Sequence, residues 1–195
     1  MKAIDFAVLI GCGLLLASCG GPDEPVESPT PVVTESSVWF SEEGQDRGVD
    51  FQLDVRETGR FAIPEIMTGG IAMFDMEGDG DLDLYMVQTG PLADIDRSGE
   101  LPTNRLYENI GEGRYSDATA ESGADDDGYG VGVAAGDFDG DGHVDLYVTN
   151  LGANVLLRNL GDGTFKDVSQ ASGTDDSGFG SSAAFVDIDQ DGDLD

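Results

Sequence analysis

Three short stretches of the chain carry acidic residues at one shared spacing. Residues 75–83, 137–145 and 187–195, here called loop one, loop two and loop three, each have acids at positions 1, 3, 5 and 9 and glycine at position 6. Calcium binds about six to eight hard oxygen atoms at flexible geometry, and alternate residues of a tight loop can direct several carboxylates inward while glycine permits the turn. The spacing therefore predicts three calcium sites.

Each predicted site uses side chains at four positions and the backbone at a fifth. The acids at positions 1, 3, 5 and 9 would bind the ion, and position 7 would offer its backbone carbonyl oxygen. Because any residue supplies a carbonyl, position 7 is free to vary among the three loops. The candidate metal-binding residues are Asp75, Glu77, Asp79, Asp81 and Asp83 in loop one, Asp137, Asp139, Asp141, His143 and Asp145 in loop two, and Asp187, Asp189, Asp191, Asp193 and Asp195 in loop three.

The charge of the chain gives a reason for a metal. Among 195 residues there are 40 Asp and Glu against 9 Lys and Arg, a formal charge of -31, and the three loops hold 14 of the acids. Crowded carboxylates repel one another and unpaired buried charge is costly, so empty loops should open or take up protons. We therefore expect metal binding and folding to be coupled. The same charge argues against nucleic acid as a partner, because phosphate binding needs clustered Lys and Arg.

Three alternatives compete with the interpretation of these stretches as calcium loops on β-hairpins. An EF-hand keeps Glu at position 12 between two helices, whereas position 12 here is Met86 or Val148, within an apparent strand. Magnesium is less suitable because it prefers a rigid octahedron with retained water. A merely solvated acidic turn would explain one copy, but three copies in register favour calcium.

The elements that position these loops recur along the chain. Residues 104–118 align with residues 154–168 at an offset of 50, and the same offset relates Asp137 to Asp187. An earlier copy has its acidic loop 62 residues before loop two. The 12 extra residues fit in the polar stretch 88–103, which we interpret as a surface insertion.

Within each copy the pattern predicts strands. Short apolar or β-branched runs at 84–87 and 146–149 are typical of strands, and the Gly-x-Gly sequences at 111–113 and 161–163 predict tight hairpin turns. No segment of 39–195 has a long helical period. Short strands repeating about every 50 residues indicate an all-β fold, a β-propeller with blades of about four strands.

The N-terminal region predicts export. The apolar run 6–17 is too short to span a bilayer as a helix but suits the core of a signal peptide. It ends in Leu-Ala-Ser-Cys at 16–19, which resembles the lipobox of bacterial lipoproteins. The resemblance implies a signal peptide at 1–18, a lipid anchor on Cys19 and a place in the cell envelope, with Gly20 favouring the outer membrane. The alternative is an ordinary cleaved signal with an incidental cysteine.

Residues 19–38 are predicted to form a tether between this anchor and the globular domain. They hold four of the seven prolines among Ser, Thr and Glu, with little to bury. The domain at 39–195 then contains no cysteine, because Cys12 leaves with the signal peptide and Cys19 would carry lipid. Disulfides cannot stabilise such a domain, and bound calcium would take their place.

A known family shares these motifs. The Asp-x-Asp-x-Asp-Gly-x-x-Asp-Leu-Tyr-Val pattern of loop two resembles the FG-GAP or VCBS repeat of integrin-type β-propellers. Residues 59–75, followed by 104–107 and Asn109, are similar to the cartilage acidic protein family in its bacterial form. The resemblance covers about residues 48–195 and implies calcium-binding blades, often followed by an ASPIC/UnbV domain. In loop one, Glu77 stands where the family pattern has Asp.

We expect the chain to be an N-terminal fragment. Residues 39–195 hold about three blades, whereas a closed propeller needs at least about four. A strand follows position 9 at once in loops one and two, but the sequence ends at position 9 of loop three. An open arc of blades would expose an unpaired sheet.

The function that these features favour is a calcium-binding, non-enzymatic scaffold of the cell envelope that binds a protein or a glycan, as in adhesion. No catalytic residue is predicted, because His143, the only histidine, lies in loop two. Paired acids at 125–127 and 175–176 recur at matching positions, which favours solvated loops over a glycosidase pair. The alternative is the propeller portion of a secreted enzyme such as a polysaccharide lyase or phospholipase. A third hypothesis is a structural, calcium-buffering layer protein.

Overall fold

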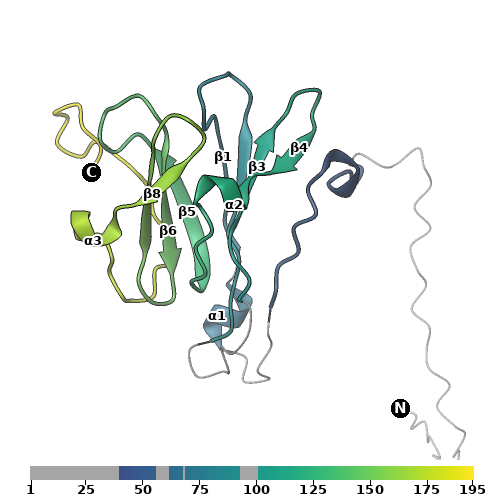
Figure 1. The fold of residues 1–195 in the computed structure, drawn as a ribbon. Coiled ribbons are helices and arrows are strands. Elements are labelled where there is room, and N and C mark those ends of the chain that lie inside the picture. The colour runs from purple at the N-terminus through teal and green to yellow at the C-terminus, as the bar shows by residue number, and fades with distance from the viewer. Residues whose placement is uncertain (1–39, 56–61, 68, 93–100) are drawn as a thin grey trace, which may run out of the picture. The chain divides into compact units, whose positions relative to one another are not determined.

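The structure is a computed structural model in which the chain divides into two compact units, Met1–Ser41 and Glu42–Asp195. The second unit contains all the described strands (Figure 1). The predicted signal peptide, its Cys19 and the predicted tether lie outside the described part of the chain. No helix that the structure describes is both long and apolar enough to cross a membrane. The described residues are 40–55, 62–67, 69–92 and 101–195.

Two four-stranded antiparallel sheets form the second unit. Each strand pairs with the next one along the chain, so both sheets are simple meanders. Sheet one consists of β1 (Ile71–Phe74), β2 (Asp83–Met86), β3 (Arg105–Asn109) and β4 (Tyr115–Asp117). Sheet two consists of β5 (Gly130–Gly136), β6 (Asp145–Asn150), β7 (Val155–Asn159) and β8 (Phe165–Asp167). The mainly β fold and the four-stranded unit are confirmed.

Helices are short and repeat with the sheets. A left-handed glycine ends both α2 and α3, with φ of 71° at Gly123 and 73° at Gly173, a conformation that glycine adopts without strain. None of the described helices exceeds four residues, as expected from the lack of a long helical period. They are η2 (Gln45–Arg47), α1 (Ile63–Ile66), α2 (Thr119–Ser122) and α3 (Ser169–Ser172).

The two outer hairpins match each other closely. In the β3–β4 turn the N–H of Ile110 donates to the carbonyl of Arg114, and in the β7–β8 turn Leu160 donates to Thr164, both at 2.9 Å. The four glycines of these turns have φ values from 66° to 85°. Left-handed backbone explains why glycine occupies these positions. The predicted turns are confirmed.

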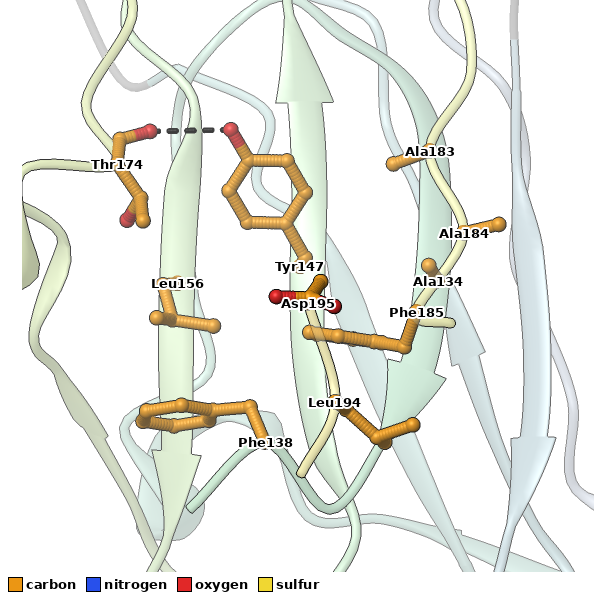
Figure 2. A pocket seen from close by; sticks show the side chains of 10 residues that line it. All are labelled: Ala134, Phe138, Tyr147, Leu156, Thr174, Ala183, Ala184, Phe185, Leu194 and Asp195. Atoms are coloured by element: carbon orange, nitrogen blue, oxygen red, sulfur yellow. Dashed lines mark hydrogen bonds between the residues drawn. The ribbon is translucent and has the colours of Figure 1, made fainter. Parts of the chain in front are cut away.

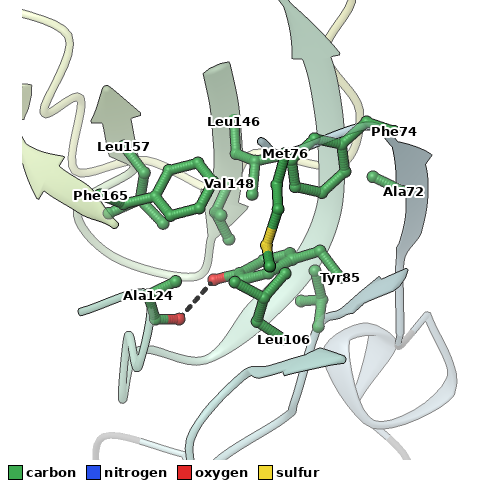
Figure 3. Packing of buried hydrophobic residues seen from close by; sticks show 11 residues of the cluster. Ala72, Phe74, Met76, Tyr85, Leu106, Ala124, Leu146, Val148, Leu157 and Phe165 are labelled. Atoms are coloured by element: carbon green, nitrogen blue, oxygen red, sulfur yellow. Dashed lines mark hydrogen bonds between the residues drawn. The ribbon is translucent and has the colours of Figure 1, made fainter. Parts of the chain in front are cut away.

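The core lies between the two sheets (Figure 3). The rings of Phe74 and Phe165 meet edge to face with centroids 6.1 Å apart, an arrangement that the charge distribution of aromatic rings favours. The backbones of the two sheets also approach closely, because a Cβ on Gly70 would lie 2.8 Å from the Cα of Gly132. The buried cluster consists of Ala72, Phe74, Met76, Tyr85, Val87, Leu106, Ala124, Leu146, Val148, Leu157 and Phe165.

Residues 174–195 carry the third acidic loop without a sheet. Leu151 and Phe179 form an isolated bridge, and Val186 and Asp195 exchange backbone hydrogen bonds of 2.8 and 3.3 Å. The described residues thus contain two sheets where about three blades were expected. By the 50-residue offset, residues 180–186 correspond to β5 and Asp195 corresponds to the first residue of β6, and among the described residues these positions form no sheet.

Candidate metal centres

Loop one joins β1 to β2 and loop two joins β5 to β6, so each closes the first hairpin of its sheet. The aspartate at position 1 holds the turn together by accepting backbone N–H bonds. Asp75 accepts from three residues at 2.7–3.1 Å, and Asp137 accepts from Asp141 and Gly142 at 3.1 and 2.9 Å. In loop three, Asp187 does the same at 2.6 and 3.1 Å. The sequence spacing therefore produces the same turn three times.

The aspartate at position 9 is buried in loops one and two. Asp83 is 1% exposed and Asp145 is fully buried. Each carboxylate accepts two backbone N–H bonds of 2.7–3.0 Å, one from position 2 of its loop and one from the asparagine that ends the third strand of its sheet. Burial nevertheless raises the pKa of both carboxyls, because the charged form loses water. Asp83 and Asp145 are thus buried carboxylates that the backbone holds in place at the base of loops one and two.

Carboxylates from positions 1, 3 and 9 converge in every loop. One oxygen from each lies within 4.8 Å of the other two. Two ligands of a single calcium ion, each about 2.3–2.6 Å from it, can be at most about 5 Å apart, so the spacing fits a shared ion. The three groups are Asp75, Glu77 and Asp83, then Asp137, Asp139 and Asp145, and finally Asp187, Asp189 and Asp195.

The residues at positions 5 and 7 stand outside these groups. In each loop the position 5 carboxylate accepts the backbone N–H of position 7, at 2.8 Å in loop one and 3.0 Å in loops two and three. Asp79, Asp141 and Asp191 therefore brace the backbone that the sequence predicts as a carbonyl ligand. The His143 imidazole lies against the backbone of Gly161 in the β7–β8 turn. The side chains of Asp81 and Asp193 likewise lie outside the three converging groups.

Loop one contains a carboxylate oxygen that lacks a partner. Oε2 of Glu77 is buried, and no hydrogen bond reaches it. Loss of water raises the pKa of Glu77 to about 7, and the charges of Asp83 and Asp79 add to the effect. A buried anionic oxygen without a donor is costly, and a cation between Glu77, Asp75 and Asp83 would satisfy it. The donor set of loop one therefore fits a hard divalent ion.

Loop two contains a cation that the sequence interpretation missed. Arg158 on β7 places Nε 2.6 Å from Oδ2 of Asp139 and Nη2 2.9 Å from Oδ2 of Asp141. Its hydrogen bond lowers the pKa of Asp141. The repeat offers a signal for this difference, because the residue 50 positions earlier, at the matching place on β3, is Glu108.

The paired acids outside the loops divide into two kinds. Asp125 and Asp127 are exposed, in agreement with a solvated loop. Asp126 is partly buried and accepts from the side chains of Asn104 and Asn150 at 3.3 and 3.2 Å. Because Asn104 precedes sheet one and Asn150 ends β6 in sheet two, Asp126 links the sheets. For this residue the expectation of a solvated side chain is wrong.

Known proteins share the region that holds the loops. Residues 75–148 and 137–195 match the family model of the FG-GAP-like repeat. The match begins at position 1 of loop one and ends at position 9 of loop three. Over 96 residues the chain is 33% identical to cartilage acidic protein 1 of Homo sapiens, and this similarity covers 44% of the chain and 14% of that protein.

Proposed function

Because the chain belongs to the FG-GAP-like repeat family, we propose that it is a calcium-binding β-propeller scaffold of the cell envelope that presents loops to a protein or glycan. The observation that carries the proposal is the convergence of three carboxylates within 4.8 Å in each acidic loop. Fold alone does not give function, and the three carboxylate groups are the features that support calcium binding.

Calcium would be held mainly by positions 1, 3 and 9 of each loop. Position 5 orients the backbone of position 7, whose carbonyl is available as a further ligand. When bound, the ion supplies positive charge that offsets the crowded carboxylates. Because loop one joins β1 to β2 and loop two joins β5 to β6, an ion held by the loop residues would stabilise the pairing of the two strands in each hairpin.

The propeller arrangement is supported by the side of sheet two that faces away from sheet one, where residues 183–185 and 194–195 lie over the strands (Figure 2). A cavity of about 320 Å³ lies there, lined mainly by apolar residues (Figure 2). Its Phe138 and Tyr147 occupy the repeat positions of Met76 and Tyr85, which sheet two covers in the core. A third sheet of the same repeat would cover this cavity in the same way. Successive sheets stacked face to face around an axis make a β-propeller.

A scaffold is favoured over an enzyme by what the loops offer. In each group the oxygen atoms of positions 1 and 9 come from carboxylates that accept backbone N–H bonds, an arrangement suited to fixing a cation. We propose that the N-terminal signal and Cys19 place this domain at the outer membrane through a lipid anchor. The rigid connecting loops would then face an extracellular protein or glycan.

The proposal is tested by titrating the calcium-free chain with calcium in a calorimeter and by digesting it with protease with and without chelator. We expect saturable calcium binding and slower cleavage within residues 69–92 and 101–195 when calcium is present, because fixed loops open less often. Magnesium at the same concentration serves as the control ion and should protect less. Equal cleavage rates and equal melting temperatures with calcium and with chelator would contradict a calcium-dependent scaffold. Incubating the calcium-loaded chain with an array of defined glycans then tests the choice of partner.

A further inference from the structure

Asn159, the last residue of β7, contacts both loop one and loop two. Its backbone N–H donates to Oδ1 of Asp145 at 2.7 Å, and Asp145 is position 9 of loop two. Its side-chain Nδ2 donates to the carbonyl of Met76 at 2.8 Å, and Met76 is position 2 of loop one. Asn159 itself is fully buried. One side chain of sheet two therefore reaches across to the loop of sheet one.

The contact with Met76 leads directly to a candidate ligand. The N–H of Met76 donates to Oδ2 of Asp83 at 2.9 Å, and Asp83 is position 9 of loop one. The peptide units of Met76 thus lie between Asn159 on one side and Asp83 on the other. Every residue named in this series is buried. A continuous run of hydrogen bonds joins the Asp145 carboxylate to the Asp83 carboxylate.

We propose that Asn159 is a positioning residue that couples calcium binding in loop two to calcium binding in loop one, an inference that rests on the proposed function. An ion in loop two fixes Asp145, and Asp145 holds the backbone of Asn159. The ordered amide of Asn159 then holds Met76 and, through it, Asp83. Loop one consequently loses less conformational freedom when its own ion binds, which appears as positive cooperativity. The effect is reciprocal, because coupling free energies are symmetric.

The preceding repeat provides a matched comparison in Asn109. Its backbone N–H donates to Oδ1 of Asp83 at 2.7 Å, and its Oδ1 accepts from Gly111 at 3.0 Å, as Asn159 does with Gly161 at 2.9 Å. Its Nδ2 donates to Leu82 at 3.2 Å, within its own loop. The two asparagines therefore share the turn and differ in the contact that Asn159 makes with another loop.

The experiment is a calcium-binding cycle on the full chain carrying D187N, which removes a ligand of loop three. Adding D75N leaves only loop two able to bind, and adding D137N leaves only loop one. The product of the two binding constants of the D187N chain, divided by the product of the two single-loop constants, gives the coupling factor. We expect a factor of about five, since one neutral hydrogen bond is typically worth that much.

Replacing Asn159 decides whether this residue carries the coupling. In the N159A background the factor should fall to one, whereas in the N109A background it should persist. An unchanged factor in N159A, or a factor of one in the parent while both loops still bind, would overturn the coupling alone. If the parent chain binds no calcium, the proposed function fails together with the coupling. Should N159A not fold, N159D and N109D form the replacement pair, because aspartate keeps the acceptor for the turn N–H and removes the donors.

Discussion

Loop one and loop two have the same spacing of acids and opposite charges beside them. In loop two, Arg158 contacts Asp139 and Asp141 at 2.6 and 2.9 Å. In loop one, the matching position on β3 is Glu108, and the charge of Glu108 contributes to the raised pKa of Glu77. The same loop therefore has a positively charged neighbour, Arg158, in the second repeat and a negatively charged one, Glu108, in the first.

The difference concerns what each loop needs in order to stay closed. Arg158 neutralises part of loop two, although the ion pairs are partly exposed and contribute little to stability by themselves. A calcium ion in loop two must compete with the guanidinium for Asp139. Among the residues that the structure describes, no Lys or Arg forms an ion pair with a carboxylate of loop one, and the buried oxygen of Glu77 has no hydrogen-bond donor. We therefore expect loop one to bind calcium more tightly and to depend on it more.

The largest expected effect comes from removing one position 1 ligand at a time. Calcium at about one hundred times its dissociation constant stabilises by about 2.7 kcal/mol per loop, which corresponds to a rise of about 5–10 °C in melting temperature for a domain of this size. D75N should remove more of the calcium-induced rise than D137N, because loop one lacks a counter-ion. The measurement is the melting temperature of each variant with calcium and with chelator.

The control for this pair is D46N, which changes an exposed acid of η2 outside the loops. It should leave the calcium-induced rise unchanged. In both test variants asparagine keeps one acceptor oxygen and replaces the other with an amide group that cannot accept, so each loses one acceptor for a turn N–H. The melting temperatures in chelator report that shared cost. If D137N removes as much of the rise as D75N, or more, the two loops do not differ in the way their charges suggest.

A smaller effect is expected from exchanging the charge beside each loop. R158Q frees Asp139 and Asp141, so calcium affinity at loop two should rise several-fold, while the affinity at loop one should change much less. E108R is the reciprocal change and should lower the affinity of loop one, because a guanidinium on β3 would compete for the loop one carboxylates. Calorimetric titration of single-loop variants measures both.

The matched control is R105Q. Arg105 lies on β3 and pairs with the exposed Asp117 at 2.9 Å, away from the acidic loops. Its replacement removes the same overall charge without freeing a candidate ligand. A rise in loop two affinity that is as large in R105Q as in R158Q would show that net charge acts at long range, and that the direct contact of Arg158 is unimportant.

The sequence predicted those parts of the molecule that repeat locally. The runs expected as strands at 84–87 and 146–149 overlap β2 and β6, and the spacing within each loop brings positions 1, 3 and 9 together. Both features follow from alternation and turn chemistry over fewer than ten residues. Four-residue helices such as α2 have no such signal, because they are too short to show a helical period.

The contacts that distinguish the repeats could not be read from the sequence. Asn159 and Met76 are 83 residues apart, and their hydrogen bond exists because the two sheets pack face to face. Arg158 reaches Asp139 through the pairing of β6 with β7. Spacing within a loop carries no information on which neighbouring strand lies beside it. The repeat alignment places Arg158 and Glu108 at the same position. That Arg158 contacts loop two follows only from the pairing of β6 with β7.

The smallest expected effect is a pH dependence that loop one should show more strongly than loop two when calcium is absent. The pKa of Glu77 lies near 7 in the folded chain against an ordinary value of 4.5. Between these values the folded state binds more protons than the unfolded state, so the free energy of unfolding rises as the pH falls from about 7 toward 4.5. Urea unfolding in chelator at pH 8 and pH 5.5 measures this rise, and E77Q should reduce it.

The reduction should be no more than about 1 kcal/mol, because water screens a partly exposed carboxylate. It should not abolish the trend, since burial also raises the pKa of Asp83 and Asp145. E112Q, at an exposed acid of the β3–β4 turn, is the control and should keep the full rise. With calcium present the trend should weaken or reverse, because protons then displace the ion from the same oxygens. A parent and an E77Q variant with identical pH dependence in chelator would mean that Glu77 ionises freely, and the contrast between the loops would then rest on Arg158 alone.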